Sequence, residues 1–358
     1  MELGRQSGER GIALIIVMAV VFVLSVLAGG FAYSMRVEMR LAQNHNHEAE
    51  LEWLGRSGVE LARYVLGQQL AIGNEPYDAL NQKWAGGIGV TNENLMDISM
   101  DNNTLGSGSF SIKIIDQERR FNINAADEVI LQQAINLVGV DASDSSTIVD
   151  SILDWRDPDD DPHLSGTESD YYLGLDPPYY AKNGPIDDLS ELLMIRGITP
   201  EIYYGQGDQA IASSRQTVTA ANRIFGQNAQ PVCSGGLADL FTPISTGLVN
   251  INTASSAVLQ LIPGIDANTA AGIIQARAGP DGVEGNDDDT PFRNVGELIN
   301  VPGINPQLVG QIGRFFTVRS ATFEVQVDAQ IDHYKHRFVA MLRRNSPRDI
   351  RLLYFNWK

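Results

Sequence analysis

The sequence is poor in sulfur and in positive charge. Its 358 residues include a single cysteine, Cys233, so the chain cannot form an intramolecular disulfide. Lysine and arginine number 26 against 44 aspartate and glutamate, which gives a formal net charge of -18. So acidic a surface repels phosphate backbones and anionic lipid headgroups, and it attracts divalent cations and basic partners. Nucleic acid is therefore not an expected ligand.

Motifs of the common enzyme classes are also missing. The sequence has no glycine-rich phosphate loop, no nucleophile elbow and no His-Glu zinc helix. Its five histidines stand mostly in polar contexts and form no convincing triad with serine and aspartate. The sequence thus predicts a protein that is not an enzyme, with a length sufficient for about two domains.

One long segment near the N-terminus carries no charge. Residues 12–35 are rich in isoleucine, valine, leucine and phenylalanine, and a helix of this length crosses a hydrocarbon core of about 30 Å. A polar leader, residues 1–11, precedes it, and no small-x-small cleavage site follows it. We expect a transmembrane helix that stays on the mature protein, with a plain signal anchor as the alternative. Apolar residues at helical spacing extend this helix to about Leu70.

The middle of the chain contains an internal duplication. Asn122-Ile123-Asn124-Ala125 is echoed by Asn250-Ile251-Asn252-Thr253-Ala254, and further identities follow at a constant offset. These are Pro185, Glu191, Leu192, Gly197, Ile198 and Pro200 in the first copy and Pro291, Glu297, Leu298, Gly303, Ile304 and Pro306 in the second. Each copy has the pattern of helices joined by tight turns at glycine. The duplication predicts a helical domain at 121–313, with repeat units at about 121–204 and 248–313.

Two loops concentrate carboxylates. In the first, Asp157, Asp159 and Asp161 alternate, and Glu168 falls eleven residues after Asp157, the spacing of the closing ligand in an EF-hand loop. Pro162 stands where an EF-hand needs glycine, so the loop is not an EF-hand. Crowded oxygen ligands without cysteine favour calcium over zinc.

We therefore predict a calcium site formed by acidic side chains of this loop, and a solvated loop is the alternative. The predicted ligands are Asp157, Asp159, Asp161, Glu168 and Asp170. The shorter second loop offers Asp281, Asp287 and Asp289 as a further candidate site.

Alternating apolar and polar residues predict strands on both sides of the helical domain. They lie at 109–115, at 322–331 and at 337–342, where the last two form a hairpin. A sheet assembled from both sides requires a discontinuous domain, residues 36–120 with 314–358. The expected fold class is α+β: a long N-terminal helix packed on an antiparallel sheet, with a large all-α insert of duplicated units.

The segment Arg10-Gly11-Ile12-Ala13-Leu14 resembles the prepilin-peptidase site of type IV pilins and type II secretion pseudopilins. The resemblance implies cleavage between Gly11 and Ile12. Two positions depart from the usual pattern: Ile12 replaces phenylalanine or methionine, and Ile16 replaces glutamate. Loss of that glutamate is characteristic of the K subunit, the largest minor pseudopilin.

Further motifs resemble the same pseudopilin K family of type II secretion systems. They are Arg120-Phe121-Asn122-Ile123-Asn124, the Asp-Trp-x-Asp pattern at Asp154, Tyr171-Tyr172, Pro177-Pro178-Tyr179 and the segment at Asn250. The resemblance implies a pilin fold with a calcium-binding helical insert and a single-pass anchor in the bacterial inner membrane, with most of the chain in the periplasm. It also implies a place at the pseudopilus tip beside the I and J pseudopilins, contact with the major pseudopilin, and a role in protein export.

The glycine turns support an alternative, because they resemble helix-hairpin-helix motifs of DNA-binding proteins. Those turns usually end in a second glycine, which is replaced here by Asp141, Thr199, Asp266 and Asn305. Anionic side chains at two of these positions disfavour phosphate. The alternative function is a membrane-tethered DNA-binding protein of a competence or type IV pilus system; a minor pilin of a motility or adhesion fibre is a third possibility.

Overall fold

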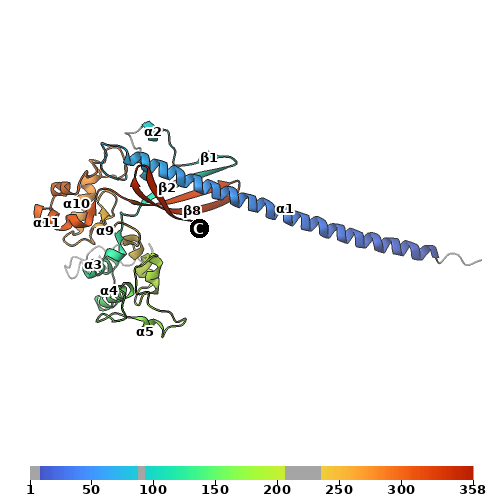
Figure 1. Cartoon of the computed structure of the whole chain (residues 1–358), viewed down its shortest axis with the longest axis horizontal. Coiled ribbons are helices and arrows are strands. Elements are labelled where there is room, and N and C mark those ends of the chain that lie inside the picture. Colours follow the sequence, from blue (N-terminus) through green and yellow to red (C-terminus); the bar gives the residue numbers. More distant parts are fainter. Residues whose placement is uncertain (1–8, 88–92, 206–234, 358) are drawn as a thin grey trace, which may run out of the picture.

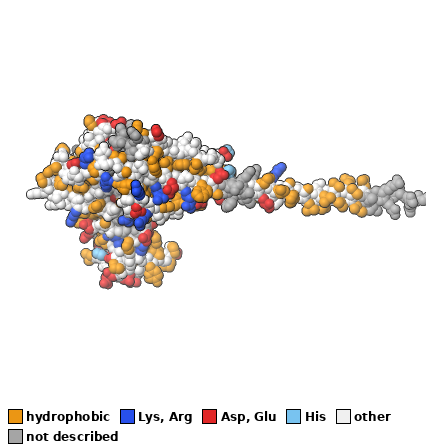
Figure 2. Space-filling view, turned by 45° about the horizontal axis from the view of Figure 1, so that its top comes forward, with side chains coloured by type: hydrophobic (Ala, Val, Ile, Leu, Met, Phe, Trp, Pro, Cys, Tyr) orange, Lys and Arg blue, Asp and Glu red, His pale blue; other side chains and the backbone are white. Residues whose placement is uncertain are grey.

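The computed structural model describes residues 9–87, 93–205 and 235–357 (Figure 1). Its first element is α1, Glu9–Leu70, a helix of 62 residues that projects far beyond the head. The segment Leu14–Met39 has a mean hydropathy of 2.8 and is not buried in the head, so its length and composition suit a membrane span. Figure 2 shows this projecting part covered with hydrophobic side chains.

The second half of α1 packs on a sheet. Its buried side chains recur at helical spacing and include Leu51, Leu54, Val65 and Leu66. The contact is close: a Cβ at Gly58 would lie 2.5 Å from a Val327 methyl group. Only glycine therefore lets the helix approach the sheet this closely.

The sheet has five antiparallel strands in the order β1-β2-β7-β8-β9. Their bounds are β1 Asn103–Leu105, β2 Gly108–Asp116, β7 Thr322–Ile331, β8 Tyr334–Ser346 and β9 Asp349–Trp357. Between α1 and β1 lie η1, Lys83–Ala85, and α2, Glu93–Met96. Strands β2 and β7 are neighbours, with Ile112 opposite Val327, although the helical domain separates them in sequence. The predicted α+β fold is confirmed.

The second strand of the predicted hairpin is longer than 337–342, because β8 runs from Tyr334 to Ser346. It is followed by β9, which the sequence pattern did not predict. Leu352, Leu353, Tyr354 and Phe355 form an uninterrupted apolar run, so no polar alternation marks them as a strand.

The first helical unit follows β2. Its elements are β3 Phe121–Asn122, η2 Ile123–Ala125, α3 Glu128–Val138, α4 Ala142–Arg156, α5 Ser169–Tyr172, η3 Leu189–Met194, α6 Pro200–Tyr204, α8 Leu237–Leu240 and β4 Phe241–Thr242. Strands β3 and β4 pair in parallel, with Phe121 opposite Phe241. The first helical unit therefore ends at β4, beyond its predicted end at about Tyr204.

The second helical unit repeats this plan. Its elements are β5 Val249–Asn250, α9 Ser256–Leu259, α10 Ala267–Arg277, η4 Val295–Asn300, α11 Pro306–Ile312, η5 Gly313–Phe315 and β6 Phe316–Thr317. Strands β5 and β6 again pair in parallel and join the two ends of the unit. The insert is thus not purely α-helical as expected, because strands of two residues are too short to leave a periodic pattern.

The duplication extends to side-chain hydrogen bonds. The amide of Asn124 both donates to the carbonyl of Ile186 and accepts from its N–H, at 2.9 and 2.8 Å. Asn252 makes the same two bonds with Phe292, each 2.9 Å long. Both units share one hydrophobic core, which is separate from the core between α1 and the sheet.

Candidate functional site

The first acidic loop folds over the C-terminal end of α4. Asp154, in the last turn of that helix, is fully buried, and its carboxylate accepts the backbone N–H groups of His163, at 3.0 Å, and of Thr167. The His163 ring also contacts this carboxylate through Nδ1. The loop backbone passes so close that a Cβ at Gly166 would lie 1.9 Å from Asp154 Oδ2. Asp154 therefore fixes the path of the loop.

Glu168 is the carboxylate of this loop in which both oxygens are buried without a hydrogen-bond partner among the described residues. The residue is only 6% exposed. Burial, followed by repulsion from Asp154 and Asp157, raises the pKa of Glu168 to about 7. A buried carboxylate without a partner is costly unless a cation neutralises it.

Asp157 and Asp159 are predicted ligands whose charges reach Glu168. Both act on the Glu168 carboxyl electrostatically, together with Asp160. Burial and the charge of Asp159 raise the pKa of Asp157, whose Oδ1 is also buried without a protein partner. Three of the predicted ligands, with Asp160, thus interact electrostatically, but among the described residues the acidic group with ligand atoms within 4.8 Å of one another contains only Asp157 of them.

Asp161 and Asp170 are placed differently. Both side chains are exposed, as are those of Asp159 and Asp160, and Asp170 lies in the first turn of α5. Asp161 contacts the loop through its backbone N–H, which donates a hydrogen bond to Asp159 Oδ1 at 3.0 Å. Among the described contacts, neither carboxylate meets the other acidic groups.

Asn183 belongs to the same site, and sequence reasoning missed it. Its side-chain nitrogen donates to the carbonyl of Asp159 and to Asp160 Oδ1, both at 2.8 Å, and its own Oδ1 is buried without a partner. Its backbone is left-handed, with φ of 47°, which asparagine tolerates. The sequence signal was weak, since only the Asn183-Gly184 pair marks a turn there.

The residues present fit a hard cation. The oxygens without protein partners belong to Asp157, Glu168 and Asn183, and carboxylate and amide oxygens are the ligands calcium prefers. Ligand atoms of Asp154, Asp157 and His163 lie within 4.8 Å of one another, but Asp154 already holds the His163 ring. The single imidazole is thus occupied, which favours an oxygen site.

The second acidic loop is held together by its own hydrogen bonds. Asp281 accepts the Val283 N–H and the Asn286 side-chain amide, both at 2.7 Å. Asp289 accepts the Gly285 N–H at 2.8 Å, and Asp287 is exposed. These contacts do not bring the three predicted ligands together, so a second metal site stays a prediction.

At three of the four glycine turns, the residue that replaces the second glycine caps the next helix; Asp141 makes no such side-chain bond. Asp266 accepts the Thr269 N–H at 2.7 Å, a bond that also lowers its pKa, and Asn305 accepts the Leu308 N–H at 2.8 Å. Thr199 makes the equivalent contact with Ile202 at 3.4 Å. Backbone groups that contact phosphate in a DNA-binding turn are therefore already satisfied here by side chains.

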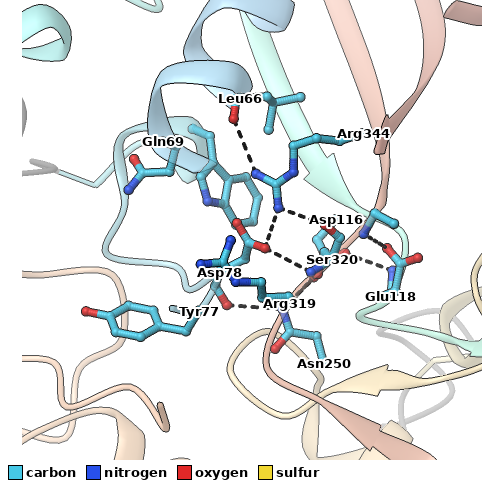
Figure 3. Close-up of polar contacts among 12 residues, drawn as sticks. Leu66, Gln69, Tyr77, Asp78, Asp116, Glu118, Asn250, Arg319, Ser320 and Arg344 are labelled. Atoms are coloured by element: carbon cyan, nitrogen blue, oxygen red, sulfur yellow. Dashed lines mark hydrogen bonds and ion pairs between the residues drawn. The ribbon is translucent and has the colours of Figure 1, made fainter. Parts of the chain in front are cut away.

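A buried polar junction connects the sheet with the second helical unit (Figure 3). Asn250 donates to the carbonyl of Asp78, to Asp116 Oδ2 and to Ser320 Oγ, at 3.1, 3.2 and 2.8 Å. Asp78 also forms a fully buried ion pair with Arg344 from β8. These bonds attach the insert to the strands between which it lies.

Glu118 completes the junction. Its carboxylate accepts the N–H groups of Thr322, at 3.0 Å, and of Thr246, at 3.2 Å. Burial and repulsion from Asp116 raise the pKa of Glu118 to about 8. Burial likewise raises the pKa of Asp116.

Gly11 and Ile12 lie in the first turns of α1, but their side chains are outside the described part of the chain, as is Cys233. The predicted cleavage site therefore stays a prediction.

Comparison with known proteins shows which family the chain resembles. The family model for type II secretion system protein K matches residues 94–205, and a helix-hairpin-helix motif model matches residues 245–317. Type II secretion system protein K of Pseudomonas aeruginosa is 25% identical over 360 residues, covering 97% of this chain and 92% of the relative. The chain is thus similar to type II secretion system protein K over nearly its whole length.

Other members of the protein K family match more locally. Type II secretion system protein K of Klebsiella pneumoniae is 24% identical over 209 residues, which cover 54% of this chain and 60% of the relative. The fold resembles a chain in the crystal structure of the GspK-GspI-GspJ complex from the type 2 secretion system of enterotoxigenic Escherichia coli. That match has a TM-score of 0.61 and 18% identity, and it covers 88% of this chain and 99% of the other.

Proposed function

We propose that this protein is a minor pseudopilin at the tip of a type II secretion pseudopilus, where it is an assembly subunit for protein export across the outer membrane. The observation that carries the proposal is the insertion of a duplicated helical domain between the neighbouring strands β2 and β7, in a head carried by a long apolar helix. No catalytic chemistry is part of this function.

The apolar half of α1 supports an anchor in the bacterial inner membrane with the head in the periplasm. Prepilin peptidase would cut between Gly11 and Ile12 and leave the whole helix on the mature protein. Mass spectrometry of the protein purified from membranes tests this point. A mature N-terminus at Ile12 supports the proposal, whereas a mature chain that begins beyond Met35 contradicts it.

The expected partners are pseudopilins of the I and J types and the major pseudopilin. The similarity to a chain of the GspK-GspI-GspJ complex supports the first two. Ile16 supports a terminal position, because a subunit with no neighbour ahead has no amino group for a glutamate to pair with, and an unpaired carboxylate within lipid is costly. Co-purification of the full-length chain with I- and J-type pseudopilins tests the assignment.

The head would hold calcium in the first acidic loop. Asp157, Glu168 and Asn183 carry the buried oxygens without partners, and Asp159 and Asp160 complete the cluster. The cation would tie the end of α4 to the start of α5 and so stiffen the first helical unit. Thermal unfolding of the full-length protein with calcium and with a chelator is the test, since a chelator should lower the midpoint and an unchanged midpoint rejects the site.

DNA binding is the less supported alternative. The protein K family match, the net charge of -18 and the capped helix N-termini all favour the pseudopilin. An electrophoretic shift assay at moderate salt distinguishes the two functions. Micromolar affinity for duplex DNA would reverse the choice.

A further inference from the structure

Strand β9 is an unprotected sheet edge. It closes the sheet on one side and pairs only with β8 among the described strands. From Ile350 to Trp357 the sole charged residue is Arg351, and no proline interrupts the run. Proteins normally protect such edges with charges, proline or a covering element, because free N–H and C=O groups recruit further strands.

The regular part of this edge is residues 354–357. A bulge leaves Leu353 without a partner in β8, and beyond it Tyr354 to Trp357 pair in unbroken register with Met341 to Phe338. Tyr354 is 40% exposed and Trp357 69% exposed. Stacking of Trp357 on the His336 ring, with centroids 5.4 Å apart, and of Phe355 on Phe338 holds this stretch in place.

Each face of that edge borders its own groove. Toward α1 lies a groove of about 450 Å³, whose aromatic wall is Phe338, Phe355 and Trp357. Toward the first helical unit lies a groove of about 730 Å³ that contains Tyr354 and Asn356. Because side chains alternate along a strand, an added strand would place its residues in the two grooves by turns.

The two grooves differ in chemistry. The one toward the helical unit is acidic: its described carboxylates are Asp187, Asp188, Asp239 and Glu324, and its guanidinium is that of Arg120. The one toward α1 has an aromatic wall on β8 and β9 and charged residues on α1, where Glu48 and Glu52 line it and Arg56 lies over the Phe355 ring at 5.3 Å. A strand with basic residues on one face and apolar residues on the other complements both.

We propose that β9 accepts an extended strand of a separate polypeptide, with alternating basic and apolar side chains, as a sixth strand of the sheet. Its backbone would pair with residues 354–357, its basic side chains would enter the acidic groove, and its apolar side chains would pack on Phe355 and Trp357. Strand addition of this kind draws affinity from the backbone and specificity from the alternate pockets.

The test uses the full-length protein in detergent micelles and a short capped peptide of alternating lysine and valine. Binding should slow hydrogen exchange of those amides of residues 354–357 that do not bond to β8. A peptide in which glutamate replaces lysine should bind about tenfold more weakly or worse, because it meets like charge in the acidic groove. Equal affinities, or no protection at saturating peptide, would overturn the proposal.

Matched variants locate the site. Tyr354→Lys places a positive charge on the acidic-groove face of β9, and it should weaken binding of the lysine peptide about tenfold. Leu105→Lys makes a comparable exposed change on β1, the opposite edge of the same sheet, and should leave binding unchanged. Equal loss in both variants would exclude β9 as the acceptor.

Other occupants give distinct results that would also overturn the proposal. Self-association of the full-length chain that Tyr354→Lys abolishes would assign the edge to a second copy. Protection, in a monomer without peptide, of those amides of residues 354–357 that do not bond to β8 would assign the edge to the chain itself.

Discussion

Arg156 and Arg277 occupy equivalent positions in the two helical units and make the same pair of hydrogen bonds. The guanidinium of Arg156 donates to the carbonyls of Ile123 and Ala126. That of Arg277 donates to those of Ile251 and Ala254. In both units an arginine at the end of the second helix closes the first turn of the unit, so the duplication kept a structural contact that no local motif reveals.

The two arginines should differ in their contribution to stability. Arg277 is almost fully buried and also pairs with Glu284, whereas Arg156 is partly exposed. Arg277→Met should lower the free energy of unfolding by about 3 kcal/mol, because it leaves carbonyls and a carboxylate without partners. Arg156→Met should cost less. Urea unfolding of both variants measures the difference, and the reverse order would contradict this account.

The ion pair between Asp78 and Arg344 should be among the most sensitive sites in the head. Both side chains are 1% exposed, so Asp78→Ala leaves a buried guanidinium without its counter-ion, at a cost of about 3–5 kcal/mol. Arg337→Ala is the control, because it breaks an ion pair with Asp328 in which both side chains are 56% exposed, and it should change stability little. Similar losses in chemical denaturation would show that burial does not decide the effect.

The junction should be more stable in acid than at neutral pH. The pKa of Glu118 is about 8 in the folded protein and about 4.3 in an unfolded chain, so the folded state holds the proton more tightly. This contribution to stability is fully present below the unfolded pKa and is lost as pH rises toward 8.

Glu118→Gln provides the test, because glutamine cannot ionise. As the pH rises from 4.5 to 8, the unfolding free energy of the wild type should fall relative to that of the variant. The acidic loop titrates equally in both proteins and cancels in this difference. A difference that stays flat across the range would show that Glu118 ionises normally.

Calcium affinity should depend on Glu168 much more than on its exposed neighbour. Glu168→Gln should weaken calcium binding about tenfold or more, since it removes the charge of a buried carboxylate that has no other partner. Asp170→Asn changes an exposed carboxylate two residues away and should have little effect. Calorimetric titration of chelator-treated full-length protein compares them, and a larger loss for Asp170→Asn would require a different ligand set.

The sequence predicted those parts of the fold that leave a periodic or repeated pattern. The apolar run of α1, the alternation in β7 and the duplicated Asn-x-Asn segments were all visible. Strand β9 was not, because its apolar residues do not alternate. The two-residue strands β3 to β6 were missed because their pairing joins positions far apart in the chain.

The predicted metal site shows a similar division. Spacing within one loop grouped Asp157, Asp159 and Glu168, whose charges do interact in the structure. It could not show that, of the predicted ligands, Asp157 and Glu168 carry the buried oxygens without partners, whereas Asp159, Asp161 and Asp170 are exposed, because alternation fails once a loop bends. Asn183 comes from a segment further along the chain. Because tertiary folding brings it to the loop, no spacing in the sequence identifies it.

The helical insert leaves and returns to the sheet across nearly a single rung of the ladder, where Asp116 lies opposite Phe323. If a turn of a few residues replaced the insert at that rung, every strand of the sheet would keep its present neighbour. Descendants of such a chain could enlarge, shrink or exchange the whole cap without altering the stem that enters the fibre. The architecture thus separates two evolutionary demands, one on how the subunit is assembled and one on what it presents to its surroundings.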